Sequence, residues 1–131
     1  PAPPQAYGQA LEGAITSAGL MEQIEQLRLF CWQRAGVDRS GRRLNAGLDH
    51  LRCELERLDQ QPLLNCLQRD ALLLDLRHRL VTSKLMLEAC LFRQESRGGH
   101  FRTDAPSSQP QWQCHSRQSR ARGLHTRAVR P

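Results

Sequence analysis

Residues 63–97 read LLNCLQRDALLLDLRHRLVTSKLMLEACLFRQESR, a stretch that contains neither proline nor glycine. At a rise of 1.5 Å per residue, it would form a helix of about 50 Å. Between Ala71 and Phe92, 14 of 22 positions are apolar, and they occupy more than one stripe of the helix surface. A helix that is apolar on more than one side needs two partners, so this stretch predicts the central member of an antiparallel three-helix bundle.

Two shorter helices are expected before this stretch. Over residues 20–35, apolar side chains recur at steps of three and four, and Gly36 is placed to end the helix as a C-terminal cap. Ser40 fits the N-cap position of a second helix over residues 41–59. The leucines of that helix repeat at steps of 4, 3, 4 and 3 residues: Leu44, Leu48, Leu51, Leu55 and Leu58. Pro62 then separates it from the third helix.

The sequence therefore predicts an all-α fold, an antiparallel three-helix bundle of the spectrin-repeat type with an extended, irregular C-terminal tail. A length of 131 residues fits one domain and excludes a second large one. We expect residues 1–19, rich in proline, glycine and alanine, to form a linker, residues 20–97 the bundle, and residues 98–131 an extended basic tail. The first residues lack a starting methionine and a signal-peptide pattern, so we expect a fragment of a larger protein.

The net charge of +6 is concentrated at the C-terminal end. Residues 1–92 hold 11 basic and 11 acidic side chains, whereas residues 105–131 hold five arginines and no acid. Such a segment buries too little apolar surface to fold alone, so we expect it to be solvated or docked on another surface. Its arginines would neutralise phosphates and Trp112 would stack on a base, but one tryptophan and no lysine cluster make a poor nucleic-acid site. We therefore do not expect nucleic-acid binding.

Motifs for catalysis and metal binding are missing from the sequence. The five cysteines form no C-x-x-C pair, and the five histidines form no helical metal-binding pair. There is no nucleophile elbow, no P-loop and no G-x-G-x-x-G dinucleotide motif. Charges interrupt every window long enough to span a membrane, and the free cysteines are typical of a reducing cytoplasm. We expect a cytoplasmic, non-catalytic piece that binds no metal.

One segment after the third helix is dense in charged residues: Glu95-Ser96-Arg97-Gly98-Gly99-His100-Phe101-Arg102-Thr103-Asp104-Ala105-Pro106. Alternation in an extended strand would put His100, Arg102 and Asp104 on one side and Phe101 and Thr103 on the other. Such a strand could dock on a separate domain through charge-assisted hydrogen bonds of Arg102 and Asp104. The alternative is a helix terminator with surface charges.

This segment resembles the E-S-R-G-x-H-x-x-x-D-x-P signature of the flavoproteins that include succinate dehydrogenase, fumarate reductase and L-aspartate oxidase. Residues 27–39 are similar to the L-R-x-x-M-W-x-x-x-G-I/V-x-R helix of that family, with Cys31 in place of the methionine. Trp112 and His115 match a W-x-x-H element that follows in the family. The aromatic residue after His100 resembles the L-aspartate oxidase branch, whereas Arg102 is closer to the other members.

The resemblance implies a C-terminal helical domain of an FAD enzyme that oxidises L-aspartate to iminoaspartate in NAD biosynthesis. Electrons would pass to oxygen or fumarate, and quinolinate synthase would consume the product. The catalytic and FAD-binding residues would belong to upstream flavin and capping domains, so this chain alone would bind no FAD. The candidate docking residues are Glu95, Ser96, Arg97, Gly98, His100, Arg102, Asp104, Trp112 and His115. The alternatives are the same domain of a succinate dehydrogenase or fumarate reductase flavoprotein, or a small helical RNA-binding module.

Overall fold

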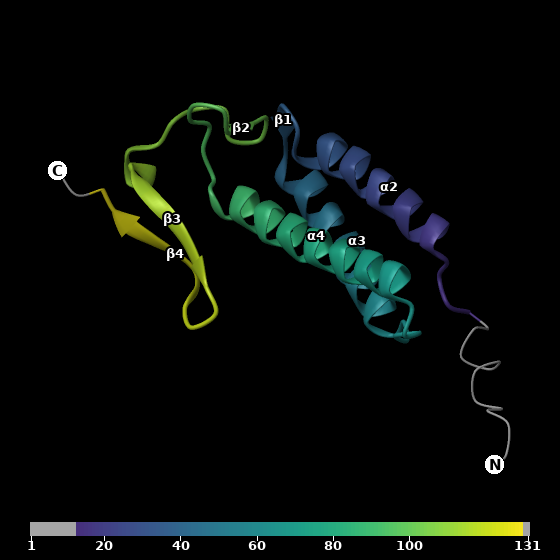
Figure 1. Ribbon diagram of the computed structural model, residues 1–131. Coiled ribbons are helices and arrows are strands. Elements are labelled where there is room, and N and C mark those ends of the chain that lie inside the picture. The colour runs from purple at the N-terminus through teal and green to yellow at the C-terminus, as the bar shows by residue number, and fades with distance from the viewer. Residues whose placement is uncertain (1–12, 130–131) are drawn as a thin grey trace, which may run out of the picture.

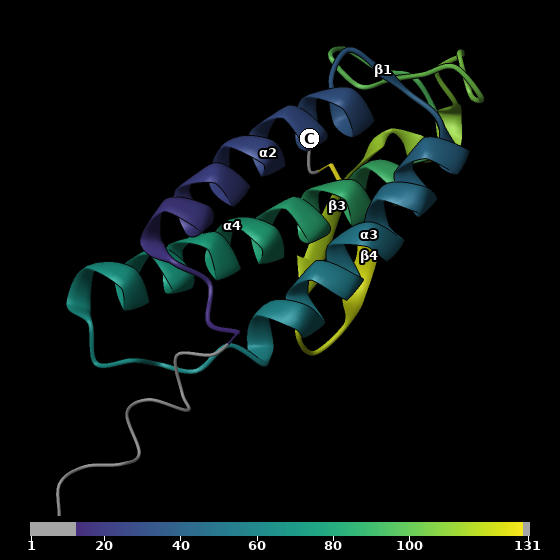
Figure 2. The same ribbon diagram turned by 90° about the vertical axis from the view of Figure 1, so that its right-hand side faces the viewer.

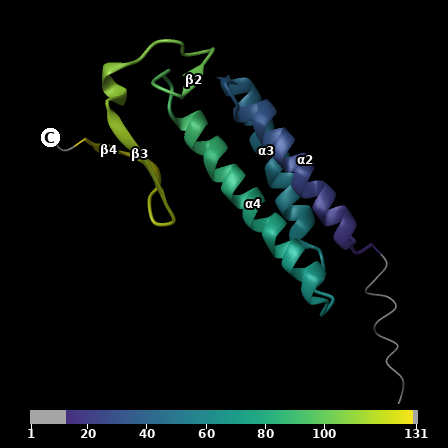
Figure 3. The same cartoon turned by 45° about the horizontal axis from the view of Figure 1, so that its top comes forward.

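The computed structural model describes residues 13–129, which form three long helices and a β-hairpin (Figures 1 and 2). The helices are α2 (Ser17–Ala35), α3 (Gly41–Asp59) and α4 (Leu67–Phe92), and they lie side by side. The hairpin consists of β3 (Cys114–Ser119) and β4 (Gly123–Ala128) in antiparallel register. Figure 3 shows it on the far side of α4 from α2.

Two shorter elements lie at one end of the helices. Strand β1 (Asp38–Arg39) joins α2 to α3 and pairs in parallel with β2 (Phe101–Arg102), which follows α4. A single 3₁₀ turn, η1 (Pro110–Trp112), leads from there to the hairpin. The chain after α4 therefore returns over the helix ends before it reaches the hairpin (Figure 1).

The first two helices agree closely with the sequence pattern. Helix α3 has the predicted bounds, and the Ser40 hydroxyl accepts from the Arg43 amide at 3.4 Å. Helix α2 ends at the predicted residue but begins at residue 17 rather than 20, because the Thr16 hydroxyl caps it by accepting from the Gly19 amide at 3.1 Å. Residues 17–19 of the predicted linker thus belong to α2, and residues 1–12 lie outside the described residues.

Helix α4 is shorter at both ends than the predicted 63–97. At its start, the Asp70 carboxylate accepts from the amides of Leu64 and Cys66, both at 3.2 Å, and so holds these residues in a loop. At its end, Arg93 has extended backbone angles, and its side chain bonds to groups further along the chain. Both ends are set by hydrogen bonds that helical periodicity does not show.

The expected all-α class is too narrow, and the expectation of an irregular tail is wrong for residues 114–128. These residues form the β3–β4 hairpin, whose second strand begins after the turn at Gly123, with a φ of +59°. The strand sequences, CHSRQS and GLHTRA, contain almost none of the β-branched or aromatic residues that predict strands. Packing against α4 stabilises them instead, including a 2.7 Å hydrogen bond from Gln118 Nε2 to Glu88 Oε2.

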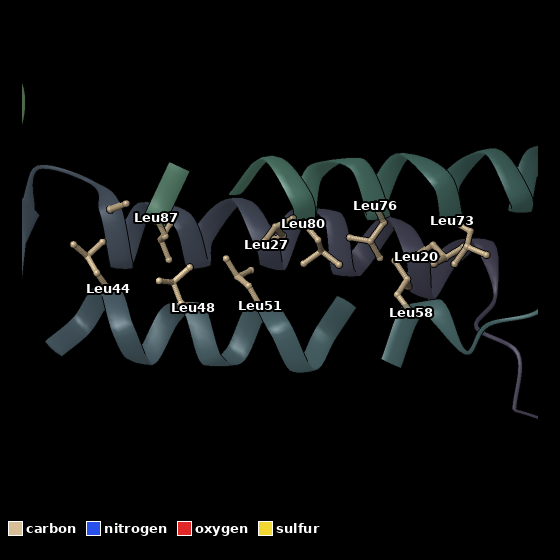
Figure 4. Packing of buried hydrophobic residues seen from close by; sticks show 11 residues of the cluster. Leu20, Leu27, Leu44, Leu48, Leu51, Leu58, Leu73, Leu76, Leu80 and Leu87 are labelled. Atoms are coloured by element: carbon tan, nitrogen blue, oxygen red, sulfur yellow. The ribbon is translucent and has the colours of Figure 1, made fainter. Parts of the chain in front are cut away.

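A leucine core holds the three helices together (Figure 4). Its members come from α2, α3 and α4 and are all less than a tenth exposed: Leu20, Leu27, Ala35, Leu44, Leu48, Leu51, Leu58, Leu73, Leu76, Leu80 and Leu87. Burying each leucine side chain contributes about 1.5–3 kcal/mol to folding. Four of the five leucines that the heptad-like spacing of residues 41–59 singled out thus belong to the core, and the fifth, Leu55, is partly buried against it.

Truncating a leucine in this core should destabilise the chain. Leu51 is completely buried, so Leu51→Ala should lower the free energy of unfolding by about 2–5 kcal/mol, through lost apolar contact and the cavity left behind. Leu74 on α4 is 48% exposed, and Leu74→Ala should cost less than about 1 kcal/mol. Urea unfolding followed by circular dichroism measures both, and equal losses would contradict the assigned core.

Candidate functional site: a charged clasp over the helix ends

Residues 95–106, which we call the clasp, lie over the end of the helices where α2 and α4 end and α3 begins (Figure 1). The clasp is held in this position by strand β2, whose Arg102 pairs with Arg39 of β1. Gly98, with a φ of +56°, makes the turn before it, and the amides of Arg97 and His100 each donate to the other's carbonyl at 2.8 and 3.0 Å. A left-handed residue of this kind favours glycine.

Arg102 and Asp104 connect α4 to α3. The Arg102 side chain is buried, and its Nη1 donates to the carbonyl oxygens of Cys90 and Leu91 at 3.3 and 3.0 Å, at the end of α4. Its Nε and Nη2 donate to the two Asp104 carboxylate oxygens at 2.8 and 2.5 Å. Asp104 in turn accepts from the Gly41 amide, the first of α3, at 2.9 Å. A cation therefore lies at a helix C-terminus and an anion at a helix N-terminus, as the helix dipoles favour.

Gly41 is required by this arrangement. A Cβ atom at that position would lie 2.9 Å from both Arg102 Nη2 and Asp104 Oδ2, closer than real contacts allow. The Arg102 guanidinium, helped by the Gly41 amide, holds the pKa of Asp104 well below its usual range. The same pairing raises the pKa of Arg102. Both groups are thus charged at neutral pH.

Glu95 anchors the other end of the clasp as a fully buried carboxylate. It accepts from Arg97 at 2.9 and 3.0 Å, from the Gln109 amide at 2.9 Å, and from Arg93. Hydrogen bonds from Arg97 above all, then from Gln109 and Arg93, outweigh the effect of burial and lower the pKa of Glu95 to about 2. A buried anion is stable only when its lone pairs are satisfied in this way.

Arg93 extends this network to Trp112 and the hairpin. Its guanidinium donates to the carbonyl oxygens of Trp112 at 3.0 Å and Cys114 at 2.5 Å, and it lies 5.5 Å from the centre of the Trp112 ring. That ring also packs edge to face on Phe92, with centroids 5.3 Å apart. Trp112 therefore makes its contacts within this chain. His115, the histidine of the W-x-x-H element, is exposed on β3.

The side chains of Ser96 and His100 make hydrogen bonds that hold the clasp together internally. The Ser96 hydroxyl accepts from the Arg102 amide and donates to the Ala105 carbonyl, both at 2.8 Å. His100 Nε2 lies 3.1 Å from the Arg93 carbonyl and Nδ1 lies 3.2 Å from Arg39 Nη1, an arrangement that assigns the proton of the neutral ring to Nε2. Burial first, then the nearby arginine charges, lower the pKa of His100.

Two arginines of this network, Arg39 and Arg93, were not among the candidate residues from sequence. Arg39 Nε donates to the Ala35 carbonyl at the end of α2 at 3.0 Å, and its Nη1 donates to Gly99 at 3.1 Å. The sequence pointed to Arg39 only through its position in the family-like block of residues 27–39. No sequence pattern pointed to Arg93, because the carbonyls that it binds are more than a dozen residues away in sequence.

One part of the clasp that faces solvent is apolar. Phe101 is 41% exposed, and it lines an open groove of about 710 Å³ together with Trp32 and Val37, which are 68% and 69% exposed. Gly98 and Gly99 form another part of the lining. Arg97, Arg102 and Asp104, which were expected to dock on a separate domain, thus bond within this chain, whereas the exposed side chains that line this groove include large apolar ones.

No group of three or more histidine, cysteine, aspartate and glutamate side chains within residues 13–129 is placed to hold a metal ion. In the same part of the chain, no helix combines the length and hydropathy needed to cross a membrane. The clasp does not fit FAD either, because its arginines and His100 are engaged with each other and with helix ends. The side chains of the clasp hold the helix ends together.

Comparison with known proteins found a matching family and several similar proteins. The family described as "Fumarate reductase flavoprotein C-term" matches residues 24–130. The L-aspartate oxidase of Synechocystis sp. is 31% identical over 108 residues, which are 70% of this chain and 20% of that protein. A fumarate reductase (CoM/CoB) polypeptide of Methanothermobacter marburgensis is 27% identical over 106 residues, 77% of this chain and 18% of that protein. The L-aspartate oxidase of Pseudomonas aeruginosa is 30% identical over 87 residues, 66% of this chain and 16% of that protein.

The chain belongs to the C-terminal domain family of the fumarate reductase flavoproteins, as the resemblance of its motifs indicated. The match reaches through the hairpin, so the basic tail is part of the family domain. The chain spans about a fifth of the length of the curated relatives it matches.

Breaking the pair of Arg102 and Asp104 should destabilise the whole helical unit. Arg102→Gln removes the cation from the α4 carbonyls and from Asp104, so the free energy of unfolding should fall by about 2–4 kcal/mol. Arg52, exposed and paired with Asp49 on α3, is a matched control, and Arg52→Gln should cost less than about 0.5 kcal/mol. Urea unfolding measures both, and a loss no greater than the control's would refute the role of the pair.

Stability should fall in two steps as the solution is acidified. His100 has a pKa below its ordinary 6.5, so the unfolded chain binds more protons below pH 6.5 and stability begins to fall there. Glu95, whose pKa folding lowers from 4.5 to about 2, and Asp104, whose pKa also lies well below its usual range, stabilise the fold above pH 4.5 and lose that contribution as the pH falls towards 2 and below. Unfolding free energies measured across this range should show both steps.

The upper step can be assigned with one substitution. His100→Gln keeps an acceptor for Arg39 and a donor for the Arg93 carbonyl but cannot titrate, so it should flatten the upper step and leave the lower one. His78→Gln, at an exposed position on α4, is the control and should retain both steps. An upper step that persists in His100→Gln would show that another group causes it.

Proposed function

We propose that this chain is the non-catalytic C-terminal helical domain of an FAD-dependent L-aspartate oxidase. The whole enzyme would oxidise L-aspartate to iminoaspartate in NAD biosynthesis, with FAD and the catalytic residues in upstream flavin and capping domains. Quinolinate synthase would consume the product in the cytoplasm. The observation that carries this proposal is the clasp, whose charged residues are bonded to helix ends and to each other rather than placed for chemistry.

Residues 1–16 would link the flavin part to an antiparallel three-helix bundle formed by α2, α3 and α4, and the clasp and the hairpin would follow this bundle in the chain. The groove of Trp32, Val37 and Phe101 is the surface that best supports docking of the flavin part. Three large apolar side chains that are each at least 41% exposed at one place are typical of a protein interface. Docking of the clasp would then use Phe101 and the glycines beside it, not the charged side chains.

The clasp gives this surface its shape. Pairing of β1 with β2 sets Phe101 opposite Asp38 and next to Val37, and Gly36 ends α2 so that Trp32 lies at the rim. A Cβ at Gly36 would overlap the Trp32 carbonyl oxygen, so glycine is required there. The buried ion pairs would therefore act on the enzyme indirectly, because they hold the groove in place.

The second candidate is the same domain in a fumarate reductase or succinate dehydrogenase flavoprotein. The similarity to the fumarate reductase polypeptide of Methanothermobacter marburgensis supports this alternative. The two candidates share the fold, the clasp and the groove, and they differ in the substrate of the flavin part. Oxidation of L-aspartate, rather than of succinate, by the polypeptide that carries this domain would distinguish them.

Replacing the groove's aromatic residues should weaken attachment of the flavin part. In the polypeptide that carries both parts, Trp32→Ser combined with Phe101→Ser should lower the melting temperature of the flavin-loaded enzyme by about 5 °C or more and speed FAD loss. Leu29→Ser combined with Leu85→Ser, at exposed positions of 58% and 41% outside the groove, is the control and should change neither.

The second half of this test uses the 131-residue chain by itself. It should fold and show no flavin absorbance after incubation with FAD, because its residues do not form a flavin site. A yellow, flavin-loaded chain would overturn the proposed non-catalytic role. Unchanged FAD retention and melting in the Trp32 and Phe101 variant would overturn the docking surface while leaving the family assignment intact.

A further inference from the structure

The β3–β4 register gathers basic side chains on one face of the hairpin. His115 stands opposite Arg127, and Arg117 stands opposite His125. Directly opposed residues of an antiparallel pair lie on the same face, and positions two apart along a strand share it. These four residues, which we call the cationic face, therefore form two neighbouring cross-strand pairs.

The opposite face of the hairpin packs against the helices. Gln118 bonds to Glu88 of α4, and Leu124 lines a cavity with Phe92 and Trp112. The Cys114 carbonyl accepts from Arg93. Because this face is fixed on α4, the cationic face is turned away from it, and three of its four residues are exposed.

The charge of the cationic face has no counterpart within the described part of the chain. On the helices, exposed arginines are mostly paired with a carboxylate, as in Arg28–Glu25, Arg52–Asp49 and Arg77–Asp59. Within residues 13–129, neither Arg117 nor Arg127 has such a pair, and residues 105–131 contain no acid at all. Arg117 and Arg127 lie on this one face as diagonal neighbours, and their like charges repel each other, so they do not help the hairpin fold.

We infer that the cationic face binds a carboxylate-rich, extended segment of a partner protein. The planar guanidinium groups of Arg117 and Arg127 match carboxylates through paired hydrogen bonds. In the described residues each strand of the hairpin pairs only with the other, so an extended segment can lie alongside it. This surface is distinct from the Trp32 groove and does not depend on the proposed enzyme.

A nucleic acid fits the same face less well. The face carries no aromatic side chain beyond its two histidines and no lysine, and Trp112 is packed on Phe92 and Arg93. Strands of six residues span about 20 Å, which allows contact with only a few phosphates. Since affinity for nucleic acid rises with the number of phosphates neutralised, so small a footprint gives weak binding.

The experiment titrates the full chain with a short synthetic peptide in which glutamate alternates with threonine. In nitrogen–proton NMR spectra at about 20 mM salt, the amides of β3 and β4 should shift, and binding should weaken strongly at about 200 mM. Arg117→Gln combined with Arg127→Gln should weaken binding about five- to tenfold. The matched control is Arg28→Gln combined with Arg52→Gln, which removes the same charge from the helices and should bind as the parent does.

If binding is detected, three outcomes would overturn the inference. The first is amide shifts that fall outside the hairpin, and the second is an equal loss of peptide affinity in the two double variants. The third is tighter binding of an oligouridylate of the same charge, which would identify a nucleic-acid site instead. Melting temperatures of both double variants should stay within about 2 °C of the parent, because all four positions are exposed. No binding of either probe at low salt would also refute the site.

Discussion

The ion pair of Arg102 and Asp104 is the contact that fixes how the helices meet at one end of the molecule. Helices α3 and α4 run antiparallel, so the C-terminus of one lies beside the N-terminus of the other, and their partial charges are opposite. One cation and one anion, bonded to each other, complement both ends at once: Arg102 bonds to the carbonyls of α4 and Asp104 to the first amide of α3. Gly41 leaves the space that the pair needs.

The chemistry of arginine explains why the basic side chains that join the clasp to α4 are arginines. Arg102 bonds to a carboxylate and to helix carbonyls at the same time, and Arg93 bonds to Glu95 and to two carbonyls. A lysine carries a single charged nitrogen and could not span these partners. Buried ion pairs of this kind add less stability than their Coulomb attraction suggests, because both charges lose water. Their effect here is to select one position for the clasp, which the leucine core alone would not determine.

Sequence patterns predicted the features that depend on neighbours along the chain. Leucine spacing gave the bounds of α3, and alternation put His100, Arg102 and Asp104 on one side of an extended segment. All three do reach the helix ends, but periodicity could not tell whether that side faces this chain or another. The ends of α4 and the hairpin were missed for the same reason. They depend on bonds between distant residues, such as Gln118 with Glu88, and the local preferences of CHSRQS and GLHTRA do not favour a strand.

The charged residues that are bonded inside the fold lie in a different part of the chain from the arginines that have no carboxylate partner. Between residues 93 and 104, three arginines face two acids, and all five are bonded inside the clasp network, so this segment contributes only +1 to the net charge. Residues 105–131 contribute the other +5. Within residues 13–129, the arginines of the hairpin meet no carboxylate, and the inner face of the hairpin is held instead by Gln118 and Leu124. A chain that neutralises most of its other surface cations with carboxylates would be more stable without this concentration of charge, so its presence points to binding of an anionic partner.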